Sequence, residues 1–269
     1  MSPLSAVELD RTTSEGWVAP PPRRDLGEVD GLRLVASGVE LAAWRGRTRV
    51  WWHRCGALPR AVHVSGDRLP VLTETPDYHA WGHLGPALLL RPDTGDRLAE
   101  LRGQRAAAVG GGRFVLGLEG YGTFETRLHD RDGALLTTWP TYGHYVPDAD
   151  GVLVVECDRR APTSSRLVRL RPDGALDRGD RLRDGRASAP VVLPGGAVLV
   201  LDAGVLLAVG RDLRATVLAE VVDVGGNSSR CHGSVELRDD DVVVTVFEHV
   251  PDASLFLTHR VRYALSGAA

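Results

Sequence analysis

Short apolar runs, separated by turn residues, recur along the whole chain of 269 residues. Clear examples lie at 152–155, 198–201 and 242–247, and Gly, Asp or Glu lies within two residues of both ends of each run. Such runs are typical of short strands, and the sustained 3.6-residue periodicity of amphipathic helices is scarce. The Trp51-Trp52 pair fits the same pattern, because successive strand residues face opposite ways, so one ring should pack inward and the other outward. The pattern predicts an all-β protein.

Six segments repeat one motif: a short strand, a tight turn and a strongly apolar strand. The residues that mark these turns are Gly38, Gly66, Gly111, Asp150, Gly195 and Asp240. The spacings between them are 28, 45, 39, 45 and 45 residues. A second hairpin with a Pro-Asp-Gly-like turn follows in most repeats, as at 167–180. Two hairpins in about 45 residues have the size of one β-propeller blade.

The repeating unit resembles the blades of regucalcin-like, NHL-repeat and PQQ-repeat propellers over residues 30–265. It consists of an apolar strand, a glycine-rich turn, a second apolar strand and an LxRxDG-like turn. These motifs determine turns and core rather than chemistry, so the resemblance implies a fold and no activity. We expect a six-bladed propeller of four-stranded antiparallel blades, with five or seven blades as the alternatives.

The last repeat lacks a clean fourth strand after 254–265. An N-terminal strand, at 16–19 or 26–29, could complete it and remove an exposed sheet edge. We therefore expect residues 1–30 to be an N-terminal extension that supplies the closing strand. Residues 31–269 would form a single propeller domain.

Charge and hydropathy exclude several classes of protein. The chain has 32 Lys+Arg and 35 Asp+Glu, a formal charge of −3, without the basic excess of nucleic-acid or anionic-membrane binders. No apolar stretch approaches the length of a membrane span, and the first 16 residues lack a signal-peptide pattern. These observations predict a cytoplasmic protein that binds neither nucleic acid nor membrane.

The residue inventory limits the chemistry. All 32 cations are Arg, so neither a Schiff-base Lys nor a P-loop Lys is present, and we expect no nucleotide cofactor. The three cysteines are an odd number without C-x-x-C spacing, which argues against a disulfide framework and a thiolate zinc site.

Acidic residues end the second strand of five repeats, although strands disfavour acidic residues. In a propeller these positions gather at one mouth of the channel, where their mutual repulsion would call for a cation, a proton or Arg partners. Oxygen ligands of this kind suit Ca²⁺, Mg²⁺ or Mn²⁺. A solvated rim is the alternative. The predicted metal ligands are Glu74, Glu119, Glu156 and Glu248.

Two histidines start the first strand of their repeats, which places them at the same rim. With the acids nearby they could act in acid–base catalysis, and strand capping is the alternative. The predicted catalytic residues are His144, His232, Glu156 and Glu248.

The segment 73–86 reads as the longest loop and concentrates polar aromatic residues on the same face. Such loops are suited to cover or contact a ligand. Together with rim residues of other repeats, it predicts a substrate-binding set. The members of this set are Tyr78, His79, Trp81, His83, Tyr142, Arg60 and Arg105.

Two hypotheses follow for the function. The first is a small-molecule enzyme at one mouth of the channel, with acid–base or divalent-metal-assisted chemistry of the hydrolase, lyase, isomerase or cyclase type. The second is a non-catalytic propeller module that binds a protein partner or a small ligand. An enzyme should concentrate charged and aromatic residues in the mouth, whereas a scaffold should spread apolar side chains over a flat face.

Overall fold

The computed structural model describes residues 4–15, 24–79, 82–120, 122–148, 151–157, 165–171, 173–183, 187–223, 231–250 and 255–266. Over these ranges the chain forms strands and turns and no α-helix, which confirms the all-β prediction. Accordingly, no helix in these ranges could cross a membrane.

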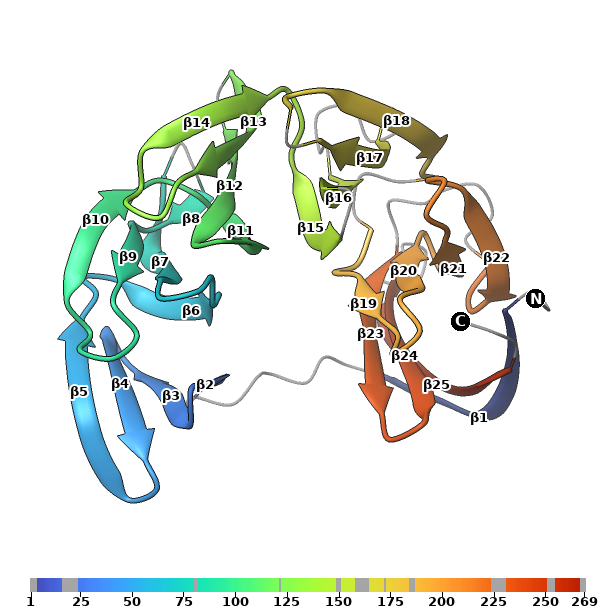
Figure 1. Ribbon diagram of the computed structural model, residues 1–269. Helices are drawn as coiled ribbons and strands as arrows, with labels where there is room; N and C mark the ends of the chain where they lie inside the picture. The colour runs from blue at the N-terminus through green and yellow to red at the C-terminus, as the bar shows by residue number, and fades with distance from the viewer. Residues whose placement is uncertain are drawn as a thin grey trace. The chain divides into compact units, whose positions relative to one another are not determined.

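The strands form six antiparallel sheets, five with four strands and one with a fifth, short strand (Figure 1). Sheet 1 runs β2 (Arg24–Val29), β3 (Leu32–Ser37), β4 (Glu40–Arg45) and β5 (Thr48–Arg54). Sheet 2 runs β6 (Leu58–Val62), β7 (Leu69–His79), β9 (Ala87–Leu90) and β10 (Arg97–Leu101), with β8 (Gly82–Leu84) paired to β7. Sheet 3 runs β11 (Arg105–Gly110), β12 (Arg113–Gly120), β13 (Thr123–His129) and β14 (Leu135–Trp139).

The second half of the chain repeats this order and ends differently. Sheet 4 runs β15 (Gly143–Asp148), β16 (Gly151–Glu156), β17 (Arg166–Leu170) and β18 (Leu176–Arg181). Sheet 5 runs β19 (Val191–Val192), β20 (Val198–Asp202), β21 (Val205–Val209) and β22 (Ala215–Glu220). Sheet 6 runs β23 (Cys231–Arg238), β24 (Asp241–Val250), β25 (Leu255–Ser266) and β1 (Ser5–Glu15). Six sheets of consecutive antiparallel strands are those of a six-bladed propeller.

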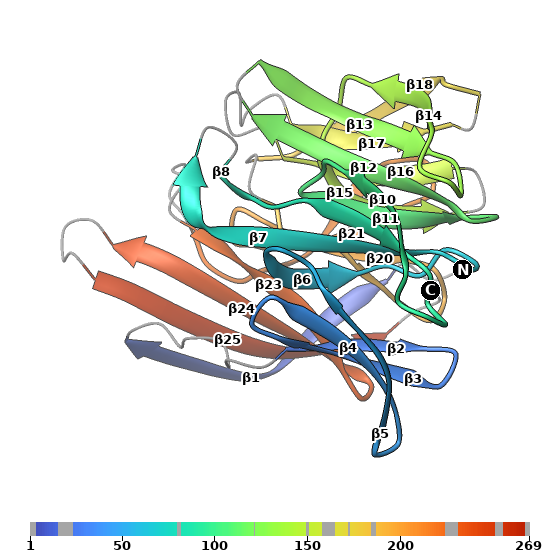
Figure 2. The same ribbon diagram turned by 90° about the vertical axis from the view of Figure 1, so that its left-hand side faces the viewer.

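The outer strand of sheet 6 comes from the N-terminus, as predicted, but from a different segment. β1 pairs antiparallel with β25 from Ser5 opposite Ser266 to Glu15 opposite Leu257 (Figure 2). The candidate at 26–29 lies in β2 and begins sheet 1, where it pairs with β3. The candidate at 16–19 lies outside the described residues.

The first repeat is displaced by one strand from the sequence-based assignment. The first hairpin of sheet 1 turns at Asp30-Gly31, both with positive φ, and Gly38 turns the second pair of strands instead. From Gly31 to Gly66 the spacing is 35 residues (66 − 31), which replaces the short spacing of 28. The inner strand β2 was missed because its register shifts between Asp25 and Gly27, which interrupts the apolar alternation.

By its internal contacts the chain divides into two compact units. Unit 1 contains residues 1–19, 153–171 and 175–269, and unit 2 contains residues 20–152 and 172–174. Inside each unit, sheets pack face to face through apolar side chains. Leu34 and Leu41 of sheet 1 meet Leu69 and Leu88 of sheet 2 in one buried cluster. Burial of each such leucine contributes about 1.5–3 kcal/mol.

Two tryptophans on outer strands of unit 2 donate hydrogen bonds to turn carbonyls of the same unit. Trp51 is buried and donates its indole N–H to the carbonyl of Pro92 at 2.7 Å, while Trp52 is 52% exposed, as predicted for this pair. Trp139 is buried likewise and donates to the carbonyl of Gly174 at 2.9 Å. Each indole is therefore buried and also provides a hydrogen-bond donor for a turn carbonyl.

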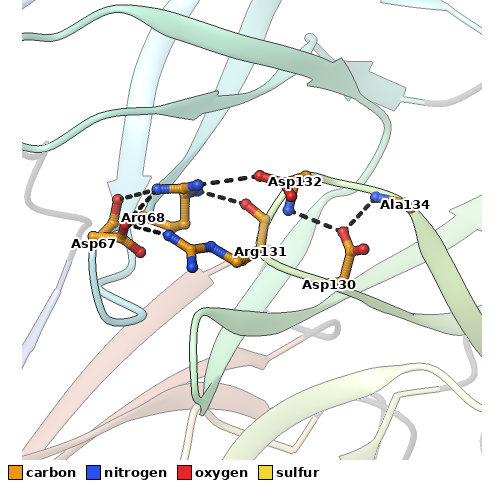
Figure 3. Close-up of polar contacts among 6 residues, drawn as sticks. All are labelled: Asp67, Arg68, Asp130, Arg131, Asp132 and Ala134. Carbon is orange, nitrogen blue, oxygen red and sulfur yellow. Dashed lines mark hydrogen bonds and ion pairs between the residues drawn. The ribbon is translucent and has the colours of Figure 1, made fainter.

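Arg68 lies in the turn between β6 and β7 and joins sheet 2 to sheet 3 (Figure 3). Its side chain is 5% exposed. Nε donates to the carbonyl of Arg131 at 2.5 Å, Nη1 lies 2.7 Å from an Asp67 carboxylate oxygen, and Nη2 lies 3.1 Å from an Asp132 carboxylate oxygen. Asp130 shapes the receiving turn by accepting the N–H groups of Asp132 and Ala134. One guanidinium thus fixes one hairpin turn against another.

Acid should destabilise the protein through His63, which follows β6. Burial lowers the pKa of this imidazole from its usual 6.5 to about 4. The unfolded chain therefore takes up the proton first as the pH falls, and stability that is complete above pH 6.5 is lost towards pH 4. We expect this residue to account for about 2 kcal/mol of that loss. Denaturant titrations at pH 6.5 and at pH 4 measure the free energy of unfolding. Between these two values it should fall less in His63→Gln than in the parent protein. The control is His83→Gln, which changes an exposed side chain and should lose as much stability as the parent.

Candidate functional site

The predicted acidic residues lie on the second strand of sheets 2 to 6, but only some of them end it. Glu156 and Asp202 are the last residues of β16 and β20, Glu119 and Glu248 lie one and two residues before the ends of β12 and β24, and Glu74 lies inside β7, which continues to His79. In sheet 1 the corresponding strand is β3, which ends at Ser37 and carries no acid at this position. Four of the acids have a partner in their own sheet or in the segment that adjoins it. Glu74 forms an ion pair with Arg60, and Glu156 accepts the N–H of Arg166 at 3.1 Å. Asp202 accepts the N–H of Arg183 at 2.6 Å, and Glu248 meets His259 at 2.8 Å.

An ion pair or a hydrogen bond thus holds each of these four carboxylates in place. Across the part of the chain that the structure describes, no three His, Cys, Asp or Glu side chains form a group that could hold a metal ion. The metal set that includes Glu74 and Glu119 stays a prediction. The melting temperature in chelator and then in Ca²⁺, Mg²⁺ or Mn²⁺ tests it, because an ion that binds only the folded state raises that temperature.

The two predicted catalytic histidines differ in surroundings. His144 lies half-buried on β15 in unit 2, and His232 lies exposed on β23 in unit 1. The His232 ring is 5.4 Å from the ring of Phe247, its cross-strand neighbour. The Glu248 carboxylate next to that phenylalanine bonds to His259. Joint action of His144 and His232 stays a prediction.

The segment 73–86, expected as a loop, is for the most part a hairpin made by β7 and β8. Tyr78 is 79% exposed and contacts the His83 ring edge-on at 5.4 Å. His83 also bonds through Nδ1 to the carbonyl of Thr75 at 3.1 Å. Alternation along an extended strand therefore presents these rings to solvent. Of His79 only the backbone is described, and Trp81 lies outside the described residues.

Arg105 and Tyr142, both predicted to contact substrate, meet in unit 2. The Arg105 guanidinium lies over the Tyr142 ring, 5.0 Å from its centroid, and Phe124 packs against the same ring at 6.1 Å. Tyr142 itself is only 5% exposed. Its ring therefore packs against the Arg105 guanidinium and is not accessible for a substrate to stack on. Arg60 belongs to sheet 2, where it pairs with Glu74.

Beside this cluster, Gly117 leaves room for two tyrosines. A Cβ at this position would clash with the Tyr145 hydroxyl and would lie 2.9 Å from the Tyr142 ring. The Tyr145 hydroxyl forms a hydrogen bond with the Thr126 hydroxyl at 2.8 Å, and burial raises the pKa of Tyr145.

We therefore expect Gly117→Ala to lower the free energy of unfolding by about 2 kcal/mol, as overpacking does. Urea titrations should show this loss. Because the closest clash is with the hydroxyl, Tyr145→Phe in the same chain should recover part of it. A Gly117→Ala protein as stable as the parent would contradict the packing described here.

Three polar side chains line up across neighbouring strands of sheet 6, and sequence reasoning had predicted only one of them. Glu248 on β24 bonds through Oε2 to His259 Nε2 on β25 at 2.8 Å. His259 Nδ1 lies 3.1 Å from Oγ1 of Thr13 on β1. The imidazole is 14% exposed and the carboxylate 22% exposed. We call Glu248, His259 and Thr13 the sheet 6 array.

Strand register brings the array together. Thr13 lies opposite His259, and His259 lies opposite Val246, two residues before Glu248, so all three side chains project from one face. Farther along this face Val244 and Val261 are fully buried against sheet 5. The sheet 6 array thus lies at the polar end of a sheet face that is otherwise apolar. The packing of this apolar face against sheet 5 fixes the strands that carry the array.

Arg11 fixes β1 against sheet 5 on the same face. Its Nη1 donates to the carbonyl of Val221 at 2.7 Å, and its Nη2 lies 2.7 Å from Glu8. The opposite face of sheet 6 is polar and carries a groove of about 410 Å³ lined by Thr12, Arg260 and Arg262 among others. Thr12 and Thr13 are therefore adjacent in sequence and lie on different faces.

Comparison with known proteins supports the fold and no particular activity. No protein-family model and no curated protein matches the sequence. Among solved structures, the chain is similar to the extracellular domain of a putative one component system from B. thetaiotaomicron, with a TM-score of 0.53 and 10% identity over 91% of this chain and 40% of that chain.

Two further similarities are weaker. The β-propeller domain of the Trilobed protease from Pyrococcus furiosus has a TM-score of 0.49 and 9% identity, over 81% of this chain and 74% of that one. The acylaminoacyl peptidase of Pyrococcus horikoshii has a TM-score of 0.45 and 8% identity, over 82% of this chain and 42% of that one. The chain spans about two fifths of the length of several of the first structures it resembles. The six sheets define a protein of the β-propeller class.

Proposed function

We propose that this propeller is a small-molecule hydrolytic enzyme whose general base is His259, oriented by Glu248. The observation that carries the proposal is the 2.8 Å bond between the carboxylate and the imidazole, both largely buried. A histidine held by a carboxylate on one nitrogen, with its other nitrogen beside a hydroxyl, has the arrangement of a catalytic base. Glu248 thereby keeps its predicted catalytic role, and His259 replaces His232 as its partner.

The tautomer follows from the carboxylate. Ionised Glu248 only accepts hydrogen bonds, so His259 donates Nε2–H to it and leaves the lone pair on Nδ1. Nδ1 faces the Thr13 hydroxyl and can accept a proton from it or from a water molecule. The imidazolium that results is stabilised by the negative charge of Glu248. This unit supports proton abstraction without a nucleotide cofactor.

A panel of activated substrates tests the proposal, for example p-nitrophenyl esters, phosphates and glycosides. We expect turnover of at least one class and a loss of about 10²–10⁴-fold in kcat/KM in Glu248→Gln. The control is Glu100→Gln, an exposed carboxylate that pairs with Arg97 on another sheet. Equal losses in both variants, or unchanged turnover in Glu248→Gln, would contradict the proposal.

The exposed β7–β8 hairpin favours a second candidate function, a non-catalytic binding module. Tyr78 is the side chain that supports it, because an aromatic ring 79% exposed on a strand is suited to contact a partner. If the whole panel is left intact by the parent protein, this module becomes the better account.

A further inference from the structure

The third member of the sheet 6 array suggests covalent catalysis. We infer that Thr13 Oγ1 is the nucleophile of an acyl-transfer reaction and that the substrates are carboxylic esters. This inference rests on the proposed role of His259 and adds the attacking atom and the substrate class. A hydroxyl within about 2.6–3.2 Å of a base that a third group orients is the structural signature of an activated nucleophile. The array shows 3.1 Å from hydroxyl to imidazole and 2.8 Å from imidazole to carboxylate.

The three strands hold these atoms in order. β24, β25 and β1 are neighbours in sheet 6, so each strand contributes one member, and ten residue pairs from Ser5 to Glu15 fix the register of β1 on β25. A shift of β1 by one residue would turn Thr13 to the other face and bring Thr12 opposite His259. The register of β1 therefore places Thr13, and not Thr12, beside His259.

Exposure differs along the array in the direction that catalysis requires. Glu248 and His259 are largely buried, whereas Thr13 is exposed on the outermost strand of the sheet. An ester can therefore reach the hydroxyl while the base and its carboxylate stay shielded from bulk water. Among the described strands β1 pairs with β25 alone, so backbone N–H groups on its other edge can donate to a developing oxyanion.

The chemistry balances with ester and water alone. Thr13 Oγ1 forms a bond to the carbonyl carbon while His259 Nδ1 takes the hydroxyl proton. The bond from that carbon to the leaving oxygen then breaks, and the imidazolium returns the proton to this oxygen, which releases the alcohol. Water next attacks the acyl-threonine with its proton going to Nδ1, and the carboxylic acid leaves as Thr13 recovers its hydrogen.

Two probes test for the covalent bond: p-nitrophenyl acetate, which would leave an acetyl group, and a fluorophosphonate, which would leave a phosphonyl group and release fluoride. Intact-mass measurement followed by peptide mapping locates the adduct. We expect one adduct per chain on Thr13 in the parent protein and in Thr12→Ala, the matched control on the other face. Thr13→Ala and His259→Gln should show none, and Thr13→Ser should restore labelling because it keeps the hydroxyl.

The outcomes separate the nucleophile from the base. An adduct that persists in Thr13→Ala, or esters that are hydrolysed without any adduct in the parent, would overturn the role of Thr13. In that case a loss of turnover in His259→Gln would still support a base that activates water. If Thr12→Ala lost labelling as completely as Thr13→Ala, the assignment would also be overturned. That result would mean that labelling depends on the structure of β1 and not on the Thr13 hydroxyl. Melting temperatures of all variants show that each is folded.

Discussion

His259→Gln should lower kcat/KM by about 10²–10⁴-fold for any substrate that the protein hydrolyses, which is the usual contribution of a general base. Glutamine can still donate a hydrogen bond to Glu248 but cannot carry the proton that Nδ1 accepts. The change therefore removes the chemistry and preserves most of the packing. Initial rates over a range of substrate concentrations should show the loss mainly in kcat, because the base acts in the transition state.

The chain offers a matched control for this variant. His249 directly follows Glu248, faces the other side of β24 and packs against Phe256 with ring centroids 4.8 Å apart. We expect His249→Gln to keep kcat/KM within a few-fold of the parent. A similar loss in both variants would show that the strand, rather than the imidazole of His259, matters for turnover.

Arg68→Ala should cause the largest loss of stability among the single changes considered, about 3 kcal/mol. Hydrogen bonds to charged groups contribute about 1.5–3 kcal/mol, and this guanidinium makes several from a nearly buried position. Its removal leaves the Arg131 carbonyl without its donor and opens space between sheets 2 and 3. At roughly 2–4 °C per kcal/mol the melting temperature should fall by about 6–12 °C.

Arg97→Ala is the control for this loss. Arg97 also pairs with a carboxylate, that of Glu100, but both side chains are more than half exposed, and such pairs contribute about 0–1 kcal/mol. Thermal unfolding followed by circular dichroism should therefore separate the two variants clearly. Equal melting temperatures would mean that the contacts of Figure 3 do not stabilise the junction.

Much of the fold could be predicted because each blade repeats local signals. Turn residues such as Gly66 and Gly111 mark hairpins, and both have positive φ in the structure. Sheet 1 was misaligned because β2 is interrupted at Gly27, where no apolar alternation marks the strand. The closing strand was misplaced because β1 is polar and almost wholly exposed along its length, so hydrophobic patterning carries no signal there.

The candidate site could be predicted only in part, for a related reason. The acids on the second strands occupy a fixed repeat position, which made Glu248 visible in the sequence. His259 lies in the third strand of its sheet, a position without a repeated polar residue, and Thr13 joins it only through the pairing of β1 with β25. Pairing between the two ends of the chain depends on long-range register, which a local pattern does not encode.

A double-mutant cycle on Glu248 and His259 tests the central claim most directly. The account predicts that kcat/KM of the protein with both Glu248→Gln and His259→Gln lies within a few-fold of His259→Gln alone, because the carboxylate acts only through the imidazole. Losses that multiply in the double variant would show two independent contributions. That result would contradict a general base made of His259 and Glu248 acting as one unit.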